Sequence, residues 1–143
     1  MELEWVYSLE NTDWQELSEL YRVAPLGDKK PDDLQTSFSN SRYICFVFDA
    51  GKLVAAGRAL ADGVDCSYIC DVAVLPDYQG LGIGKAIVGK LIEFSKGHRK
   101  IILYASAGNE AFYRRLDFRR MSTAMAIFAD QEQALAMGLL QQD

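Results

Sequence analysis

The N-terminal part of the chain changes from an alternating to a helical pattern of apolar positions. Alternation over residues 3–9 predicts a half-buried strand. Apolar residues then recur every three or four positions over residues 13–21, which predicts an amphipathic helix capped by Asn11 or Thr12. A second short helix is expected over residues 32–38, because the proline before it suits a first helical turn.

Three strands are predicted in the middle of the chain. Residues 43–48 are aromatic and β-branched, and residues 53–60 form the expected hairpin partner, joined by a turn in which Gly51 takes a positive φ. Residues 66–75 are nearly all apolar, which is typical of a central strand with both faces covered. The three segments predict a meander.

A glycine-rich stretch leads from this strand into a long helix. Apolar residues from Ile83 to Phe94 recur at helical spacing, and Gly97 ends the helix. A short apolar strand is expected over residues 100–105. Because a helix connects it to the strand over residues 66–75, the two strands should run parallel.

The C-terminal part predicts two helices and one strand. Asn109 suits the cap of a short helix in which Phe112 and Leu116 form an inward pair. Alternation over residues 122–128 predicts a closing strand, and residues 130–140 predict a last helix.

The composition is that of one globular domain over residues 1–143, with half of the residues apolar and 24% charged. No apolar run approaches the ~20 residues of a membrane span, and the N-terminus has no signal-peptide pattern, so a cytoplasmic location is expected. The net charge of −5 argues against general nucleic-acid binding. Cys45, Cys66 and Cys70 follow no ligand spacing, and His98 is the only histidine, so no metal site is expected.

Three glycines mark the candidate binding loop. Gly80, Gly82 and Gly84 occupy alternate positions where the long helix must begin. Glycine lets backbone N–H groups approach a ligand closely, and the first N–H groups of a helix have no partner within it. Those groups lie at the positive end of the helix dipole, so a phosphate or pyrophosphate is the expected ligand.

Two familiar glycine motifs do not fit this loop. The triphosphate-binding loop requires Ser or Thr after Gly-Lys, but Ala86 follows Lys85, and Gln79 stands where its first glycine belongs. The dinucleotide fingerprint fails because Lys85 occupies its third glycine position.

A third motif fits. Gln79, Gly82 and Gly84, preceded by an apolar strand ending in Val-Leu-Pro, resemble the acyl-CoA-binding motif of the GCN5-related N-acetyltransferase family. Residues 109–118 resemble the family's second motif, a short helix reading Phe-Tyr-x-x-x-Gly-Phe. Asp117 stands where the family usually has glycine, at a left-handed position that aspartate tolerates. The resemblance covers most of the chain in element order and is specific at these two places.

The resemblance implies an α/β (α+β) fold with a mixed central sheet of six to seven strands. The sheet would be mostly antiparallel with one splayed parallel pair, flanked by four to five helices. Acetyl-CoA would bind as co-substrate where the strand over residues 66–75 splays from the strand over residues 100–105, with no metal. The residues expected to contact it are Val72, Ala73, Val74, Gln79, Gly80, Leu81, Gly82, Ile83, Gly84, Lys85, Asn109 and Phe112.

Basic residues cluster in the second half of the chain: Lys96, Arg99, Lys100, Arg114, Arg115, Arg119 and Arg120. Near a phosphate-binding loop, such a cluster would meet the ribose 3′-phosphate of the coenzyme, or it would form a solvated surface. The sequence leaves both alternatives open.

The implied reaction is attack of a free amine on the thioester, so a base or a water path must first remove a proton from the ammonium. Tyr113 matches the family's tyrosine near the coenzyme sulfur and is expected to protonate the leaving thiolate. Asp71 is the candidate base, because a carboxylate in so apolar a strand is costly unless it is used or paired with an arginine or tyrosine. Tyr68, Cys70 and a water chain ending at Asp65 or Asp71 are the alternatives.

The predicted function is an acetyl-CoA-dependent N-acetyltransferase acting on a primary amine of a small molecule or peptide. The alternative is a non-catalytic CoA-binding module that regulates a protein partner, but Tyr113 and the intact glycine loop favour the enzyme. The acidic first third of the chain favours a cationic amine, in a pocket that Tyr21, Phe38, Tyr43 and Tyr68 are available to line. No nucleic acid or membrane is expected as a partner, and a homodimer is compatible with the family.

Overall fold

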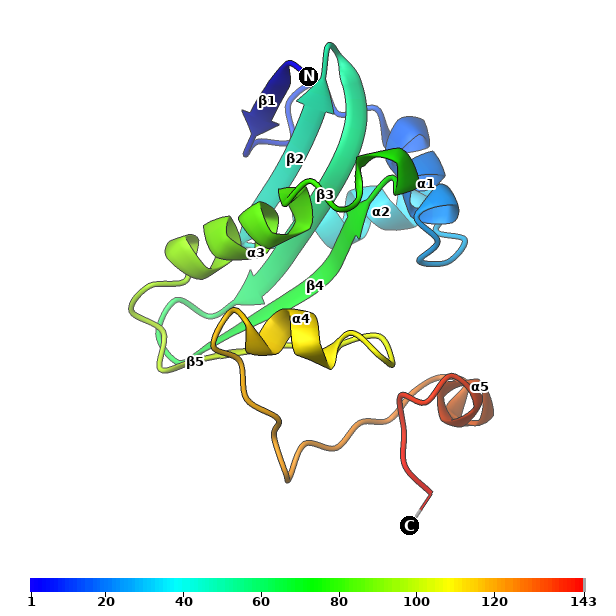
Figure 1. Ribbon diagram of the computed structural model, residues 1–143, viewed down its shortest axis with the longest axis vertical. Helices are drawn as coiled ribbons and strands as arrows, with labels where there is room; N and C mark the ends of the chain where they lie inside the picture. Colours follow the sequence, from blue (N-terminus) through cyan, green and yellow to red (C-terminus); the bar gives the residue numbers. More distant parts are fainter. Residues whose placement is uncertain (143) are drawn as a thin grey trace. The chain divides into compact units, whose positions relative to one another are not determined.

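Five strands form one sheet in sequence order. The computed structural model describes residues 1–142, which form two compact units, Met1–Leu103 and a second unit that begins at Tyr104. The strands of the first unit are β1 (Leu3–Val6), β2 (Tyr43–Asp49), β3 (Lys52–Ala61), β4 (Cys66–Val74) and β5 (Lys100–Ile102) (Figure 1). Neighbours from β1 to β4 run antiparallel, and β5 runs parallel to β4, as the connection through a helix predicted.

The sheet is smaller than the expected six to seven strands. Within residues 1–142 it has five, and the closing strand expected over residues 122–128 is not among them. The alternating side chains there, Met125 and Ile127, are 94% and 95% exposed. Alternation alone does not make a strand, since the backbone N–H and C=O groups also need partners on a neighbouring strand.

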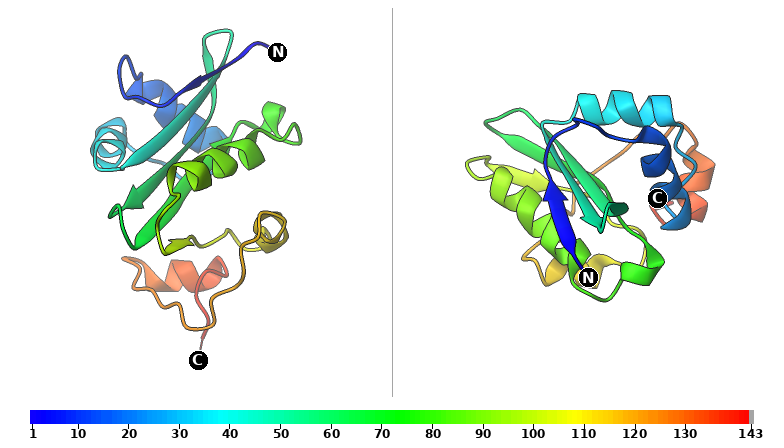
Figure 2. Two further views of the ribbon diagram at one scale, coloured as in Figure 1. Left: turned by 90° about the vertical axis from the view of Figure 1, so that its left-hand side faces the viewer. Right: turned by 90° about the horizontal axis from the view of Figure 1, so that it is seen from above.

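Helices cover both faces of the sheet. Figure 2 shows α1 (Trp14–Val23) and α2 (Pro31–Ser39) on one face and α3 (Ile83–Phe94) on the other. The core beneath the first two helices contains Leu17, Leu20, Tyr21, Leu34 and Phe38 with the strand residues Ile44, Phe46, Leu53, Ala56 and Ala73. On the opposite face, α3 buries Ile83, Ile87, Val88 and Leu91, the apolar stripe that its spacing predicted.

The first helix begins later than its expected caps. Asp13 is the N-cap of α1, and its Oδ1 accepts hydrogen bonds from the backbone N–H groups of Gln15 and Glu16. Thr12 instead donates its hydroxyl to the Leu9 carbonyl, and Asn11 has a φ of 59°. The prediction of Asn11 or Thr12 was therefore wrong by one or two residues, because three neighbouring residues are all good caps and the local pattern does not rank them.

Gly57 on β3 lets α3 pack closely against the sheet. A Cβ atom at this position would lie 2.8 Å from Ile87 Cγ2 and 3.3 Å from Val72 Cγ2. We therefore expect Gly57→Ala to lower the free energy of unfolding by about 1–3 kcal/mol, measured by urea denaturation, because a closely packed core resists an added carbon.

Gly89 on α3 provides the matched control. A Cβ atom there meets nothing within 4 Å, so Gly89→Ala should keep or raise stability, by up to roughly 0.5–1 kcal/mol from helix propensity. Equal stability of the Gly57 and Gly89 variants would contradict the packing argument.

The second unit contains two short helices, α4 (Glu110–Arg114) and α5 (Gln131–Ala136). Asn109 occupies the N-cap position of α4, but its side chain makes no capping hydrogen bond. Asp117 has a φ of 70°, so the left-handed conformation expected at this position is confirmed. The last helix was expected over residues 130–140, but α5 is shorter, and Asp130 caps it by accepting from the Gln133 N–H.

Candidate active site

The edge of β4 that faces β5 is largely unpaired. The parallel pairing joins only Cys66, Ser67 and Tyr68 to β5, whereas β4 continues to Val74. Beyond Tyr68, the described residues provide no second strand on this edge, so alternate backbone N–H and C=O groups are available to a ligand. The predicted coenzyme contacts Val72, Ala73 and Val74 lie on this free stretch. The splayed parallel pair expected from the sequence is therefore present in the first unit.

A β-bulge lies at the beginning of the free stretch. Ala56 pairs with Ala73 and Arg58 with Cys70, so Gly57 faces both Asp71 and Val72. Asp71 has a φ of 55°, a left-handed conformation that is uncommon for a residue with a side chain. The buried hydroxyl of Tyr21 on α1 donates a hydrogen bond of 2.5 Å to the Asp71 carbonyl, which holds the bulge to the helix.

The Asp71 side chain is paired with two cations. Its Oδ2 accepts a hydrogen bond of 2.9 Å from Arg58 Nε, and its Oδ1 lies 3.6 Å from Lys29 Nζ. Arg58 Nη1 also donates to Ser41 Oγ at 3.2 Å. The sequence left Asp71 as either a functional carboxylate or the partner of an arginine, and the structure shows the second arrangement. A function as base stays a prediction.

The glycine loop presents free backbone donors at the beginning of α3. Gly80 and Gly82 have φ angles of 80° and 84°, and Gly82 is the N-cap of the helix with no side chain to cap it. The first helical hydrogen bond runs from Ala86 N–H to the Gly82 carbonyl, so the N–H groups of the preceding turn, which includes Gly84 and Lys85, have no partner in the helix. A Cβ atom placed at Gly80 or Gly82 would have no other atom within 4 Å, so the space beside both glycines is open. This is the arrangement that a pyrophosphate requires.

Side chains that precede the glycines fix the loop. The Gln79 side-chain amide donates to the Val74 carbonyl at 3.0 Å, which ties the loop to the end of β4. Tyr78, in a 3₁₀ turn (η1, Pro76–Tyr78), donates its hydroxyl to Asp49 Oδ2 at 2.7 Å. This bond is the main reason that the pKa of Asp49 is lowered, with a second contribution from the backbone N–H of Glu2. Sequence reasoning missed Tyr78 and Asp49, because no local pattern connects residues so far apart.

Tyr113 lies among aromatic rings in the second unit. Its ring meets Phe112 and Phe118 edge to face, with centroids 5.0 and 5.9 Å apart. Burial raises the pKa of the Tyr113 hydroxyl above its ordinary value, so the group is protonated at neutral pH. Asn109, Phe112 and Tyr113 thus belong to one short segment of the second unit, whereas Asp71, the free edge of β4 and the glycine loop belong to the first.

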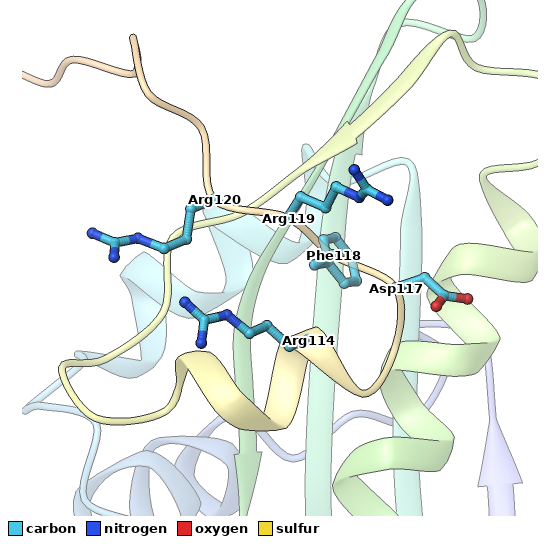
Figure 3. A pocket seen from close by; sticks show the side chains of 5 residues that line it. All are labelled: Arg114, Asp117, Phe118, Arg119 and Arg120. Atoms are coloured by element: carbon cyan, nitrogen blue, oxygen red, sulfur yellow. The ribbon is translucent and has the colours of Figure 1, made fainter.

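A basic pocket lies within the second unit (Figure 3). Its lining residues are Arg114, Asp117, Phe118, Arg119 and Arg120, and Figure 3 shows Asp117 pointing away from Arg114 and Arg120. Three of the seven clustered basic residues therefore share one pocket. Lys100 is paired instead with Asp65, at 2.8 Å, in the first unit.

The remaining candidate groups are free thiols. Cys45 is buried, and Cys66 and Cys70 are half-buried. Within residues 1–142, no group of three or more His, Cys, Asp or Glu side chains has a metal-binding arrangement. No helix in the same residues is both long enough and apolar enough to span a membrane.

A mixed sheet with an unpaired β4 edge, followed by an open glycine-rich helix N-terminus, is the arrangement of a coenzyme A-dependent acyltransferase fold. The sequence model of the acetyltransferase (GNAT) family matches residues 6–118, which is well over half of the chain. The chain therefore belongs to the GNAT acetyltransferase family, whose members transfer acyl groups from acetyl-CoA. The resemblance inferred from the two motifs is confirmed.

Two relatives and one solved structure illustrate the similarity. The chain is 39% identical over 89 residues to serotonin N-acetyltransferase 2, chloroplastic, of Oryza sativa subsp. japonica, covering 59% of this chain and 44% of that protein. It is 38% identical over 78 residues to glucosamine 6-phosphate N-acetyltransferase of Trypanosoma brucei brucei, covering 53% and 49%. The chain thus spans less than half the length of these relatives.

A probable acetyltransferase of Staphylococcus aureus has the same fold. Its structure superposes with a TM-score of 0.79 at 19% sequence identity, covering 90% of this chain and 98% of that one.

Proposed function

We propose that this protein transfers the acetyl group of acetyl-CoA to a primary amine of a small molecule or peptide by direct attack on the thioester. The observation that supports this function best is the unpaired edge of β4 next to the open N-terminus of α3. The first feature suits an amide-rich pantetheine arm, and the second suits a pyrophosphate.

The coenzyme is held mainly by backbone groups. Val72, Ala73 and Val74 bind the pantetheine arm along β4, and the loop from Gln79 to Lys85 (Gln79, Gly80, Leu81, Gly82, Ile83, Gly84 and Lys85) surrounds the pyrophosphate. Asn109 and Phe112 are the proposed side-chain contacts to the coenzyme. Because Gln79 already bonds to the Val74 carbonyl, its side chain positions the loop and leaves phosphate binding to the amides.

In the reaction, a C–N bond forms as the C–S bond breaks. The ammonium form of the amine first gives a proton to water, the free amine attacks, and a backbone N–H of β4 stabilises the oxyanion that develops on the thioester oxygen. Tyr113 gives its proton to the thiolate that leaves. Its raised pKa keeps that proton available at neutral pH. The second proton that the nitrogen loses after attack also passes to water, from which the Tyr113 phenolate left by the thiolate step is reprotonated.

The acceptor is an amine, as it is for the relatives named after serotonin and glucosamine 6-phosphate. Two of the aromatic residues expected to line its pocket do not suit that function, because Tyr21 and Phe38 are fully buried in the core. Their apolar contacts with the sheet explain their presence without a ligand.

A thiol-release assay over a panel of amines tests this function. Acetyl-CoA with a suitable amine should release free CoA faster than acetyl-CoA alone, and mass spectrometry should find the amine heavier by one acetyl group. If acetyl-CoA binds but no amine increases thiol release, the chain is the CoA-binding regulatory module that the sequence left as the alternative.

The pocket of Arg114, Arg119 and Arg120 is the proposed site of the ribose 3′-phosphate. The double substitution Arg119→Ala and Arg120→Ala should weaken acetyl-CoA binding by about 100-fold or more, because charge-assisted hydrogen bonds contribute roughly 1.5–3 kcal/mol each and about 1.4 kcal/mol corresponds to a factor of 10. Binding of 3′-dephospho-CoA, measured by calorimetry, should not change. Arg99→Ala, which alters an exposed basic residue outside the pocket, is the control. No loss for either coenzyme would show that these arginines form a solvated surface, and equal losses for both would show that they act on a part of the coenzyme other than the 3′-phosphate.

A further inference from the structure

Two basic side chains meet one carboxylate at the β4 bulge. Arg58 Nε and Lys29 Nζ lie 2.9 and 3.6 Å from different oxygens of Asp71. The side chains of Arg58, Lys29 and Asp71 are 14%, 30% and 22% exposed. A ligand can therefore reach these three side chains, although they are partly shielded from water. Two cations and one anion leave a net charge of +1. A second anion would balance it.

Both cations keep hydrogen-bond donors that the protein does not use. Arg58 donates through Nε and Nη1, but Nη2 has no hydrogen bond within residues 1–142. No fully buried side-chain nitrogen in that part of the chain lacks a partner, so Nη2 is not fully buried. Lys29 Nζ is 3.6 Å from Asp71, beyond hydrogen-bond distance, and its ammonium group has three donors.

The protein holds this cluster in place. Ser18 Oγ donates to the Lys29 carbonyl at 2.5 Å, which fixes the loop between α1 and α2. The Arg58 guanidinium carbon lies 5.8 Å from the centre of the Phe38 ring, and the Tyr21 hydroxyl binds the Asp71 carbonyl. Because the donors are already oriented, an anion would bind with little loss of side-chain freedom.

The cluster lies next to the proposed reaction centre. Asp71 directly precedes Val72, the first of the β4 residues proposed to bind the pantetheine arm. The glycine loop leads into α3, on the face of the sheet opposite to α1 and α2. If the coenzyme enters from the α3 face, the opposite face remains available to the amine. Arg58 and Lys29 lie on that opposite face, with α1 and α2.

We infer that Lys29 and Arg58, positioned by Asp71, bind an anionic group of the acceptor, so that the acceptor is an amine that also carries a phosphate or a carboxylate. This inference rests on the proposed acetyl transfer and names the class of its substrate. It replaces the cationic amine suggested by the acidic first third of the sequence, because the charge next to the β4 bulge is positive.

Matched pairs of acceptors test the inference. Thiol release is measured with phosphoethanolamine against ethanolamine, and with β-alanine against β-alaninamide. We expect kcat/KM to be about 10-fold or more higher for the anionic member of at least one pair. The pair that shows the difference identifies phosphate or carboxylate as the group that binds.

Lys29→Gln should raise KM for that anionic acceptor about 10-fold and leave its neutral counterpart unchanged. The control is Lys30→Gln, which removes the same charge from the exposed neighbouring residue and should change neither acceptor. Lys29 is chosen over Arg58 because its looser contact makes misfolding of the variant a smaller concern.

Asp71→Asn separates positioning from base catalysis. As a positioning residue, Asp71 should affect KM for the anionic acceptor more than KM for its neutral counterpart. If kcat falls for all amines and the pH profile loses a limb, Asp71 is the base, and the positioning function assigned to it here is wrong.

Two results would overturn the inference itself. Equal kcat/KM within both pairs, unaffected by Lys29→Gln, would reject the anion site and leave acetyl transfer intact. If no amine releases thiol, the proposed function fails instead. Calorimetry with phosphoethanolamine and β-alanine then shows whether Lys29 and Arg58 bind an anion. No binding of either, or equal binding by the Lys29→Gln variant, would reject the anion site.

Discussion

Replacing Tyr113 with phenylalanine is expected to lower kcat by about 100-fold. A positioned general acid contributes roughly 10²–10⁴-fold, and phenylalanine keeps the ring but has no proton to give to the thiolate. KM for acetyl-CoA and the midpoint of urea unfolding should change little, because the edge-to-face contacts with Phe112 and Phe118 involve the ring alone. Steady-state thiol release and denaturation measure the two effects.

The pH dependence strengthens this test. Because burial raises the pKa of Tyr113, the acid form persists as pH rises past the ordinary tyrosine value of about 10. The ratio of the kcat of the unchanged protein to the kcat of the Tyr113→Phe variant should therefore be constant between about pH 7 and about pH 9, because this whole range lies below the ordinary tyrosine pKa of about 10. Tyr104→Phe removes a hydroxyl from a tyrosine that is 59% exposed in the same unit and is the control. Full activity of Tyr113→Phe would show that Tyr113 is not the acid.

Gly82→Ala is expected to weaken acetyl-CoA binding about 10-fold. Gly82 has a φ of 84°, and a residue with a Cβ pays roughly 1–2 kcal/mol in this region, where about 1.4 kcal/mol corresponds to a factor of 10. The space beside the glycine is open, so the effect comes from the backbone: when the loop relaxes, the amides of α3 no longer converge on the pyrophosphate. Fluorescence or calorimetric titration with acetyl-CoA measures the change.

Gly89→Ala, in the helix that Gly82 caps, is the matched control. The space beside Gly89 is equally open, but Gly89 does not have a positive φ. The Gly89→Ala variant should bind acetyl-CoA as the unchanged protein does. Should Gly82→Ala bind equally well, the N-terminus of α3 is not the pyrophosphate site, whatever the activity of the enzyme.

The features that the sequence determined are local ones. The apolar spacing identified the five strands, with β2, β3 and β4 correct to within one residue at each end, and the three helices of the first unit, because a side chain's periodicity depends only on its own element. The positive φ of Gly51 and Asp117 followed from residue type and turn position. The glycine loop and the segment around Tyr113 also lie within single stretches of sequence, and they were sufficient to identify the family.

Only the tertiary structure decided which distant residues meet. Asp71 on β4 is paired with Arg58, 13 residues away, and with Lys29 from the loop between α1 and α2. Tyr78 fixes the coenzyme loop through Asp49. The sequence also predicted a closing strand over residues 122–128, and the structure has none there. The physical reason is the same in each case. A repeat of apolar positions determines which side chains share a face, whereas hydrogen bonds and ion pairs between elements depend on the path of the chain that brings them together.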